Sequence, residues 1–373
     1  MIIKNAAVFH ETDGFQQKDI TIDGQFFANH SADSSVINAT DLYAIPGLID
    51  IHTHGCMKSD YAISDSASIN HMLEYEASNG VTGICATTMT LSEQALTEAC
   101  HQIKNSHTEL GAAIVGINLE GPFVSPDKLG AQNPEFLAKP DYDMFCRLQK
   151  ESGNIVKLID LAPEIDGAME LIEKLSKDVR CSLAHTTADY DTAMKAFTCG
   201  ARHLTHLYNA MPPFSHRAPG VIGAACDTES VTVELICDGI HVHPSVVRTT
   251  FKMFGDDRII LISDSMMATG LTDGIYELGG LPVEVKDNVA TLVEGGNIAG
   301  SVTNLMNCMR IAVKDMKIPL HSAVKCASVN PAKAIGIYDQ RGSIEQGKFA
   351  DLVLLDQDLN IKYVVVRGKL VRA

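Results

Sequence analysis

Two histidines, His52 and His54, are separated by one residue and follow an apolar run that ends at Ile51. Residues i and i+2 of a strand point to the same side, so two imidazoles at this spacing can converge on one metal ion. A His-x-His pair alone is more often a coincidence or a surface pair than a pair of ligands. Whether this pair indicates a metal site therefore depends on which residues follow the other apolar runs.

Four more polar residues stand where other apolar runs end: Glu120, His185, His206 and Asp264. If these runs are strands of one parallel barrel, their carboxyl ends share one face, and active sites of barrel enzymes lie on that face. Imidazole and carboxylate ligands on a rigid rim suit Zn²⁺ or a similar divalent ion. Any one of these residues could be an ordinary, hydrogen-bonded core residue. Their shared position at five strand ends favours a metal centre.

Asp264 is the predicted catalytic residue. Coordination to a metal lowers the pKa of bound water toward ~7. A carboxylate at hydrogen-bond distance can take that water's proton and then deliver it to a departing amine, which leaves poorly as an anion. An aspartate that caps a loop after a strand fits the local sequence equally well, and it is the surrounding ligand set that favours the catalytic interpretation.

The elements that must position these residues alternate along the middle of the chain. Apolar runs typical of buried parallel strands lie at 44–51, 81–88, 113–119, 155–161, 180–184, 203–205, 231–237 and 258–262. Stretches with helical spacing lie between most of them, at 68–78, 92–104, 168–176, 190–198 and 244–254. About eight β-α units predict an α/β fold of the (β/α)8 TIM barrel type. A doubly wound sheet fits the same alternation, because alternation does not reveal closure.

The two ends of the chain have a different sequence pattern from its middle. Short β-like runs separated by turns lie at 2–9 and 19–27, and again at 350–355 and 361–366. We expect residues 1–46 and 340–373 to pair as a small β-sandwich domain beside a catalytic barrel of residues 47–339. A Gly-rich insert at 270–300 and helices near 302–314 and 320–334 follow the last apolar run.

The composition limits the classes of partner. The 373 residues carry a formal net charge of −16, which argues against nucleic acid or an anionic membrane as the main partner. A phosphorylated small substrate stays compatible, because a local Arg and His pair can act within a Debye length of ~10 Å. The ten cysteines show no CxxC spacing, as expected in a reducing cytosol. The N-terminus does not read as a signal peptide and no apolar stretch spans a bilayer, so we expect a cytoplasmic protein.

Several motifs together resemble a known family. They are Pro-Gly-Leu-Ile-Asp-Ile-His-Thr-His-Gly at 46–55, Asn-Leu-Glu-Gly-Pro at 118–122, Ala-His-Thr at 184–186, Thr-His-Leu-Tyr-Asn-Ala-Met at 205–211, Asp-Gly-Ile-His at 238–241, Ser-Asp-Ser at 263–265 and the closing Gly-Lys-x-Ala-Asp at 347–351. The first and last identify the amidohydrolase superfamily. Leu-Glu-Gly-Pro and His-Leu-Tyr-Asn-Ala-Met are more discriminating, and with them the whole chain resembles the N-acetylglucosamine-6-phosphate deacetylases.

This resemblance implies a metal-dependent hydrolase of amino-sugar metabolism that converts N-acetyl-D-glucosamine 6-phosphate to D-glucosamine 6-phosphate and acetate. It implies that Glu120, His185 and His206 hold the main divalent metal, with Zn²⁺ the expected ion. His52 and His54 match the superfamily's first two ligands, which some of these deacetylases have lost. A second metal bridged through Glu120 is therefore compatible with this sequence.

The resemblance also implies substrate contacts, at Ala131, Gln132, Asn209, Ala210, Arg217, His241, Ile298, Ala299 and Gly300. Arg217 and His241 match residues that bind the phosphate, and a neighbouring subunit supplies part of this site in the family. A homodimer or homotetramer is therefore expected. Many family members carry His where this chain has Gln132, and Gln can donate a hydrogen bond but cannot carry charge.

Three alternatives stay open from the sequence. Another amide hydrolase of the superfamily would not need Arg217 and His241 as a phosphate site. N-acetylgalactosamine-6-phosphate deacetylase differs in its substrate by the configuration at one hydroxyl. A non-enzymatic barrel is disfavoured, because no residue of the ligand set is missing.

Overall fold

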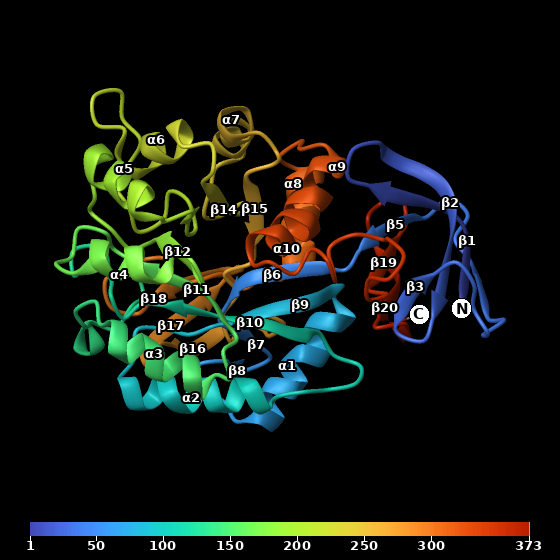
Figure 1. Ribbon diagram of the computed structural model, residues 1–373, viewed down its shortest axis with the longest axis horizontal. Helices are drawn as coiled ribbons and strands as arrows, with labels where there is room; N and C mark the ends of the chain where they lie inside the picture. The colour runs from blue at the N-terminus through green and yellow to red at the C-terminus, as the bar shows by residue number, and fades with distance from the viewer. Residues whose placement is uncertain (373) are drawn as a thin grey trace.

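The computed structural model describes residues 1–372. Figure 1 shows an α/β body on one side and a sheet that contains both chain termini on the other. The body holds the residues singled out above, and the terminal sheet packs beside it.

Eight parallel strands form the centre of the body, in the order β15-β14-β13-β12-β11-β10-β9-β6. Their bounds are β6 (Leu48–Thr53), β9 (Val81–Thr87), β10 (Ala113–Glu120), β11 (Val156–Leu161), β12 (Arg180–Leu183), β13 (His203–Leu204), β14 (Thr232–Ile236) and β15 (Ile259–Ile262). Such strands are covered on both faces, which explains their nearly continuous apolar sequences. Just after β15 the Asp264 N–H donates to the carbonyl of His52, a residue of β6, at 2.9 Å. The sheet is thus a nearly closed barrel, and the predicted fold is confirmed.

Helices follow most barrel strands, and the five predicted in this region are present. The helices are α1 (Ser66–Ser78), α2 (Glu93–Asn105), α3 (Tyr142–Glu151), α4 (Ala168–Leu175), α5 (Tyr190–Cys199), α6 (Gly220–Asp227), α7 (Pro244–Phe254) and α8 (Leu305–Lys314). After them come α9 (Leu320–Val324), a π-helical turn (Lys325–Val329) and α10 (Asn330–Ala334). Helices α3 and α6 were not predicted from the sequence. Helix α3 carries a local signal, because the Asp141 carboxylate accepts the N–H groups of Asp143 and Met144 as an N-cap.

The apolar run at 44–51 is two strands, not one, and its prediction as a single barrel strand was wrong. Strand β5 (Tyr43–Pro46) belongs to the terminal sheet, and the barrel begins with β6 after Gly47. A Cβ added at Gly47 would lie 2.2 Å from Thr82 Oγ1. The chain therefore passes between the two sheets at a position where only glycine fits.

The terminal sheet joins both ends of the chain in the order β21-β20-β19-β5-β1-β2-β3, with β4 paired to β1. Its strands are β1 (Ile2–His10), β2 (Gly14–Asp23), β3 (Phe26–Ala28), β4 (Val36–Asn38), β19 (Leu352–Leu355), β20 (Ile361–Val366) and β21 (Lys369–Arg372), together with β5. Strand β5 pairs with β1 on one side and with β19 on the other, so the predicted pairing of the two ends is confirmed. The domain boundaries near residues 46 and 340 stay a prediction.

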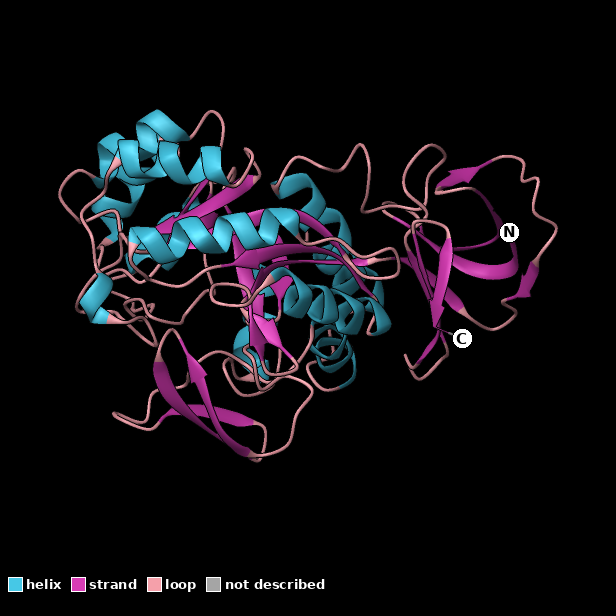
Figure 2. Cartoon of the chain, turned by 90° about the horizontal axis from the view of Figure 1, so that it is seen from below, coloured by secondary structure: helices cyan, strands magenta, loops and turns pink. Residues whose placement is uncertain are grey.

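The Gly-rich insert contains a three-stranded antiparallel sheet that the sequence analysis did not predict. It consists of β16 (Gly274–Leu278), β17 (Leu281–Lys286) and β18 (Val289–Leu292). Two-residue turns join them, Gly279-Gly280 and Asp287-Asn288, and all four turn residues have positive φ. This conformation favours two-residue hairpins, so the turn residues were the overlooked signal. Figure 2 shows the small sheet beside the barrel and well apart from the terminal sheet. A short hairpin, β7 (Gly55–Cys56) with β8 (Ser59–Asp60), follows β6.

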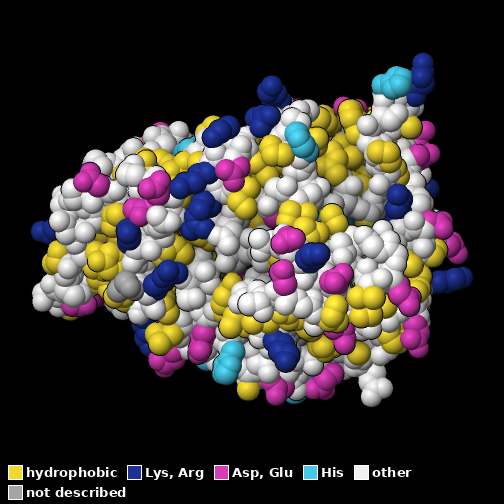
Figure 3. All heavy atoms as spheres, turned by 180° about the vertical axis from the view of Figure 1, so that it is seen from behind, with side chains coloured by type: hydrophobic (Ala, Val, Ile, Leu, Met, Phe, Trp, Pro, Cys, Tyr) yellow, Lys and Arg dark blue, Asp and Glu magenta, His cyan; other side chains and the backbone are white. Residues whose placement is uncertain are grey.

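The surface carries acidic and basic side chains together. Figure 3 shows Lys and Arg side chains interspersed with Asp and Glu over the rear face. None of the helices in residues 1–372 is both long and apolar enough to span a bilayer. All ten cysteines are free thiols.

Candidate metal-dependent active site

The six residues predicted for metal binding and catalysis lie together at the carboxyl end of the barrel. They come from the ends of β6, β10, β12, β13 and β15, and they are His52, His54, Glu120, His185, His206 and Asp264. All six are buried, and Asp264 is the most exposed at 8%. Parallel strands that end at one rim place side chains from distant parts of the sequence within contact distance.

One group of possible ligands consists of Glu120, His185 and His206. Glu120 Oε1 lies 3.1 Å from the Nε2 atom of each histidine. The two Nε2 atoms are also 3.1 Å apart. Three atoms that carry lone pairs thus face one point from three different strands.

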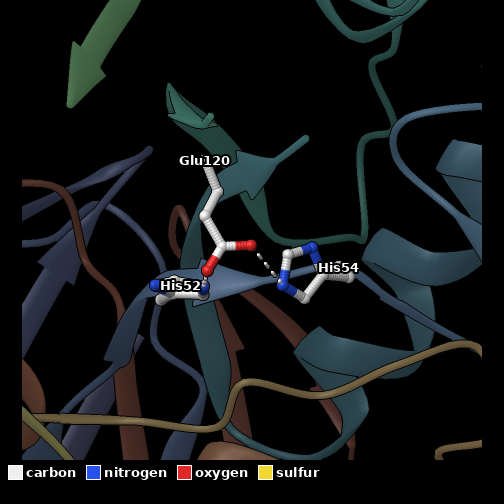
Figure 4. A group of neighbouring side chains, drawn as sticks. All are labelled: His52, His54 and Glu120. Atoms are coloured by element: carbon white, nitrogen blue, oxygen red, sulfur yellow. Dashed lines mark ion pairs between the residues drawn. The ribbon is translucent and has the colours of Figure 1, made fainter. Parts of the chain in front are cut away.

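A second group consists of His52, His54 and the same Glu120. Figure 4 shows the Glu120 carboxylate pointing between the two imidazoles. His52 Nε2 lies 3.4 Å from Glu120 Oε1, and His54 Nε2 lies 3.5 Å from Oε2. Asp264 Oδ1 is 3.3 Å from His54 Nε2. The two groups therefore share Glu120, and Asp264 borders the second.

The hydrogen bonds of the histidines fit a cation between them. His185 Nδ1 lies 2.9 Å from the carbonyl oxygen of Lys128, which can only accept, so the neutral ring carries its proton on Nδ1. Its Nε2 then presents a lone pair to the cluster. His52 Nε2 is buried and makes no hydrogen bond within residues 1–372, although it faces Glu120. Lone pairs held in this way by neighbouring acceptors are typical of metal-ligating histidines.

The backbone at three of these positions is strained. His185, His206 and Asp264 have φ values of 44°, 28° and 50°, in the left-handed region that residues other than glycine rarely adopt. Each residue directly follows the end of a strand or lies within two residues of it. Such strain clusters at active sites, where the surrounding structure enforces it to aim a side chain.

The electrostatics of the cluster favour ionised carboxylates. Burial acts to raise the pKa of Glu120, but the neighbouring imidazoles of His185 and His206 outweigh it and hold that pKa well below the usual value. Burial acts on Asp264 in the same direction, yet the hydrogen bond and charge of His54 leave its pKa lowered. Both carboxylates are therefore available as anions to a cation or a proton.

A cavity of about 920 Å³ opens over the cluster. Seven of the nine predicted substrate residues line it: Ala131, Gln132, Asn209, Ala210, His241, Ile298 and Gly300. Ala299 is fully buried and does not line the cavity. Arg217 is exposed on the surface and does not line it either. The structure thus brings together most of the predicted contacts but not both members of the predicted phosphate pair.

The segment from Ile298 to Gly300 lies against the catalytic candidate. A Cβ added at Gly300 would lie 3.1 Å from the carbonyl oxygen of Asp264, and Gly300 has a φ of 64°. The next residue, Ser301, donates its N–H to that carbonyl at 2.7 Å. This contact fixes the position of Asp264 at the cavity wall.

Three buried residues beneath the cluster were missed by the sequence analysis: Asp160, His203 and Glu234. Asp160 and Glu234 are fully buried, and Asp160 Oδ2 lies 4.0 Å from His52 Nδ1. Burial raises the pKa of Asp160 to about 8. A signal was present, because each acid lies between apolar residues inside a strand, Asp160 in β11 and Glu234 in β14. Buried charges persist only where partners hold them.

Comparison with known proteins agrees with this geometry. The sequence profile of the amidohydrolase family matches residues 43–371. The chain belongs to the amidohydrolase family. This family is metal-dependent, and the His and Glu cluster of this amidohydrolase is able to bind a metal.

Named relatives of this amidohydrolase extend over most of its length. It is 38% identical over 336 residues to N-acetylglucosamine-6-phosphate deacetylase of Bacillus subtilis (strain 168), covering 88% of this chain and 85% of that protein. It is 32% identical over 328 residues to N-acetylgalactosamine-6-phosphate deacetylase of Escherichia coli O157:H7, covering 87% of this chain and 86% of that protein.

Solved structures extend the likeness to the whole fold. A variant of N-acetyl-D-glucosamine-6-phosphate deacetylase from Mycobacterium smegmatis, in complex with N-acetyl-D-glucosamine-6-phosphate, superposes with a TM-score of 0.92 at 31% identity. The superposition covers 100% of this chain and 99% of that one. The N-acetylglucosamine-6-phosphate deacetylase of Thermotoga maritima gives a TM-score of 0.89 at 30% identity, with 100% of both chains covered.

Proposed function

We propose that this amidohydrolase is an N-acetylglucosamine-6-phosphate deacetylase, which hydrolyses N-acetyl-D-glucosamine 6-phosphate to D-glucosamine 6-phosphate and acetate. The observation that carries the proposal is the convergence of two His and Glu groups with Asp264 at the wall of one cavity. Relatives that bear this name match the chain over most of its length. Amino-sugar catabolism or recycling is the corresponding metabolic role.

The residues of this chain divide the work by position. Glu120, His185 and His206 would hold the tighter metal ion, with Zn²⁺ the proposed ion because nitrogen and oxygen ligands in this number suit it. A bound divalent ion supplies Lewis acidity, which polarises an amide carbonyl and makes water easier to deprotonate. His52 and His54, which face Oε1 and Oε2 of Glu120, would hold a second, weaker ion together with that carboxylate.

Asp264 moves the proton that the reaction requires. Its Oδ1 accepts a proton from the attacking water as the carbon–oxygen bond forms at the acetyl carbonyl. The same atom then donates that proton to the sugar nitrogen as the carbon–nitrogen bond breaks, so that the amine leaves neutral. Its lowered pKa keeps the carboxylate free to accept at neutral pH.

The cavity residues position the sugar phosphate. Asn209 and Ala210 offer an amide side chain and backbone groups at the cavity wall. His241 Nδ1 lies 2.7 Å from Asp238 Oδ2 and donates to it, which leaves Nε2 available for a phosphate oxygen. Arg217 is exposed, and we propose that it completes the phosphate site of a neighbouring subunit in a homodimer or homotetramer.

One experiment tests the reaction and the epimer together. The protein is loaded with Zn²⁺, and acetate release is measured from N-acetylglucosamine 6-phosphate, N-acetylgalactosamine 6-phosphate and unphosphorylated N-acetylglucosamine. We expect the highest kcat/KM for the first. Preference for the second would support the galacto alternative, which one relative at 32% identity represents. Equal activity on the unphosphorylated sugar would instead indicate another amide hydrolase.

We also propose that the protein works in the cytoplasm. Ten free thiols suit a reducing compartment, and seven of them are buried. The proposed phosphorylated substrate is small, so a net charge of −16 does not oppose it.

A further inference from the structure

Glu234 is a fully buried acid in the middle of β14, inside the barrel beneath the proposed metal site. A carboxylate in this position is costly unless several donors satisfy it. Three donors do so, and two of them belong to residues of the metal cluster. Glu234 is therefore bonded to the metal cluster although it does not line the cavity.

Both oxygens of Glu234 are used. Oε2 lies 3.1 Å from His52 Nδ1 and 3.0 Å from the backbone nitrogen of His206. Oε1 lies 3.0 Å from His203 Nε2. One carboxylate therefore contacts a residue of each ligand group, His52 of the second and His206 of the first.

The contact with His52 determines where its proton resides. A carboxylate only accepts, so His52 Nδ1 must carry the proton. The neutral ring then presents a lone pair at Nε2, which faces Glu120 Oε1 at 3.4 Å. A metal ligand needs this lone pair, and an acceptor bound to the other ring nitrogen is the usual means of fixing it.

The contact with His203 orients Glu234 in turn. Burial lowers the pKa of His203, so its ring carries a single proton. Its Nε2 faces Glu234 and its Nδ1 lies 2.6 Å from Thr232 Oγ1. The hydroxyl of Thr232 can donate to Nδ1 while Nε2–H donates to the carboxylate. His203 thus donates to Glu234 from one side and His52 donates to it from the side of the metal site, so the donors converge on one carboxylate.

We propose that Glu234 is a positioning residue: it holds His52 in the tautomer that binds metal and fixes the backbone that carries His206. The inference rests on the metal centre of the proposed function and adds to it a residue outside the ligand set. It predicts that the charge of Glu234 controls metal affinity without contact to metal or substrate.

The test is Glu234→Gln, which keeps shape but gives one end of the side chain a donor. That end must face His203 Nε2–H or the Nδ1 of His52, so one ring has to change its tautomer or lose its partner. We expect Zn²⁺ affinity, measured by chelator competition, to fall by about 10- to 100-fold, the usual effect of losing such a partner. Nitrogen-15 NMR of the zinc-free protein should show a changed tautomer among the buried histidines.

The control is Glu76→Gln in α1, because Glu76 is also buried, at 2% exposure, and within residues 1–372 makes no hydrogen bond or ion pair with the metal cluster. It should leave Zn²⁺ affinity and the histidine tautomers unchanged. Glu234→Asp is a second variant in case Glu234→Gln does not fold. It keeps the charge but moves both carboxylate oxygens away from His52 and His203. We therefore expect a smaller loss of Zn²⁺ affinity than in Glu234→Gln.

The outcomes separate this inference from the proposed function. Wild-type Zn²⁺ affinity in a folded Glu234→Gln or Glu234→Asp variant would overturn the role of Glu234, while the wild-type protein would still release acetate. An equal loss in Glu76→Gln would also overturn it, because the effect would then follow from any buried glutamate. Failure of the wild-type protein to bind a divalent ion would overturn the proposed function itself.

Discussion

The side-chain amide of Gln132 donates from Nε2 to Oε2 of Glu120 at 2.5 Å. Its Oε1 accepts the backbone N–H of Thr90 at 2.7 Å, which fixes the orientation of the amide. Gln132 therefore gives a neutral hydrogen-bond donor to the Glu120 oxygen that faces His54.

Changing Gln132 to Glu should increase the affinity of the site for a cation. One oxygen of the new carboxylate can still accept the Thr90 N–H, while the other lies against Glu120 Oε2. Two carboxylates at this distance repel unless a proton or a metal ion lies between them. We expect the stabilisation by Zn²⁺, measured as the change in free energy of unfolding, to exceed that of the wild type by about 1.4 kcal/mol, the equivalent of a tenfold affinity.

Gln102→Glu is a matched control for this change. Gln102 Nε2 donates to Glu98 Oε1 at 2.7 Å and its Oε1 accepts the Ser66 N–H at 3.0 Å, on the surface of α2. It reproduces the same pair of hydrogen bonds without a metal cluster. If both variants gained equally from Zn²⁺, the effect would not come from Glu120.

Asp264→Asn should abolish most turnover. The amide cannot accept a proton from water or return it to the sugar nitrogen, and general acid–base catalysis is worth about 10²- to 10⁴-fold in rate. Acetate release is measured at saturating substrate, and metal content is measured on the same sample. Near wild-type turnover in a folded variant with its metal would exclude Asp264 as the base.

Replacing both His52 and His54 by Asn should remove one metal ion and keep the other. The two imidazoles lie 3.4 Å and 3.5 Å from the Glu120 oxygens, and neither belongs to the group of Glu120, His185 and His206. Total metal content should fall, while the site of Glu120, His185 and His206 stays loaded.

Replacing two exposed histidines outside the cluster, His71 and His101, is the control and should not change metal content. Loss of all metal from the folded His52 and His54 variant would mean that the tighter site includes this pair. The proposed division of ligands would then be wrong.

Binding of the phosphorylated substrate should weaken as pH rises through the pKa of His241. Burial acts to lower this pKa, but the hydrogen bond and charge of Asp238 leave it above its usual value. The cationic ring therefore persists to a higher pH than that of a free histidine. Asp238→Asn removes the carboxylate, so the rise of KM should begin at a lower pH. A profile unchanged by Asp238→Asn would mean that His241 does not bind the phosphate as a cation.

Arg217→Ala should raise KM for the phosphorylated sugar and leave any slow hydrolysis of the unphosphorylated sugar unchanged, because a phosphate contact can only matter when phosphate is present. Arg217 does not line the cavity of its own chain, so light scattering of the oligomer accompanies the kinetics. Arg147→Ala is the control, since that exposed arginine pairs with Glu93 on α2. Equal losses on both sugars would assign Arg217 a structural role.

The sequence by itself determined the barrel strands and the residues at their ends. Apolar runs such as that of β15 are a local property, and parallel strands place whatever follows them on one rim. For this reason Glu120, His185, His206 and Asp264 could be predicted together before their distances were known. The motifs at these positions also indicated the family to which the chain belongs.

Only the tertiary structure decided how these residues work on one another. The bond from His52 to Glu234 joins residues 182 positions apart, and that from Gln132 to Glu120 depends on the Thr90 backbone. Local periodicity does not encode either contact, because each depends on the curvature that closes the barrel and on loop backbones with positive φ. The exposed position of Arg217 has the same origin: the family resemblance predicts a phosphate ligand, but the path of its loop keeps it out of the cavity of its own chain.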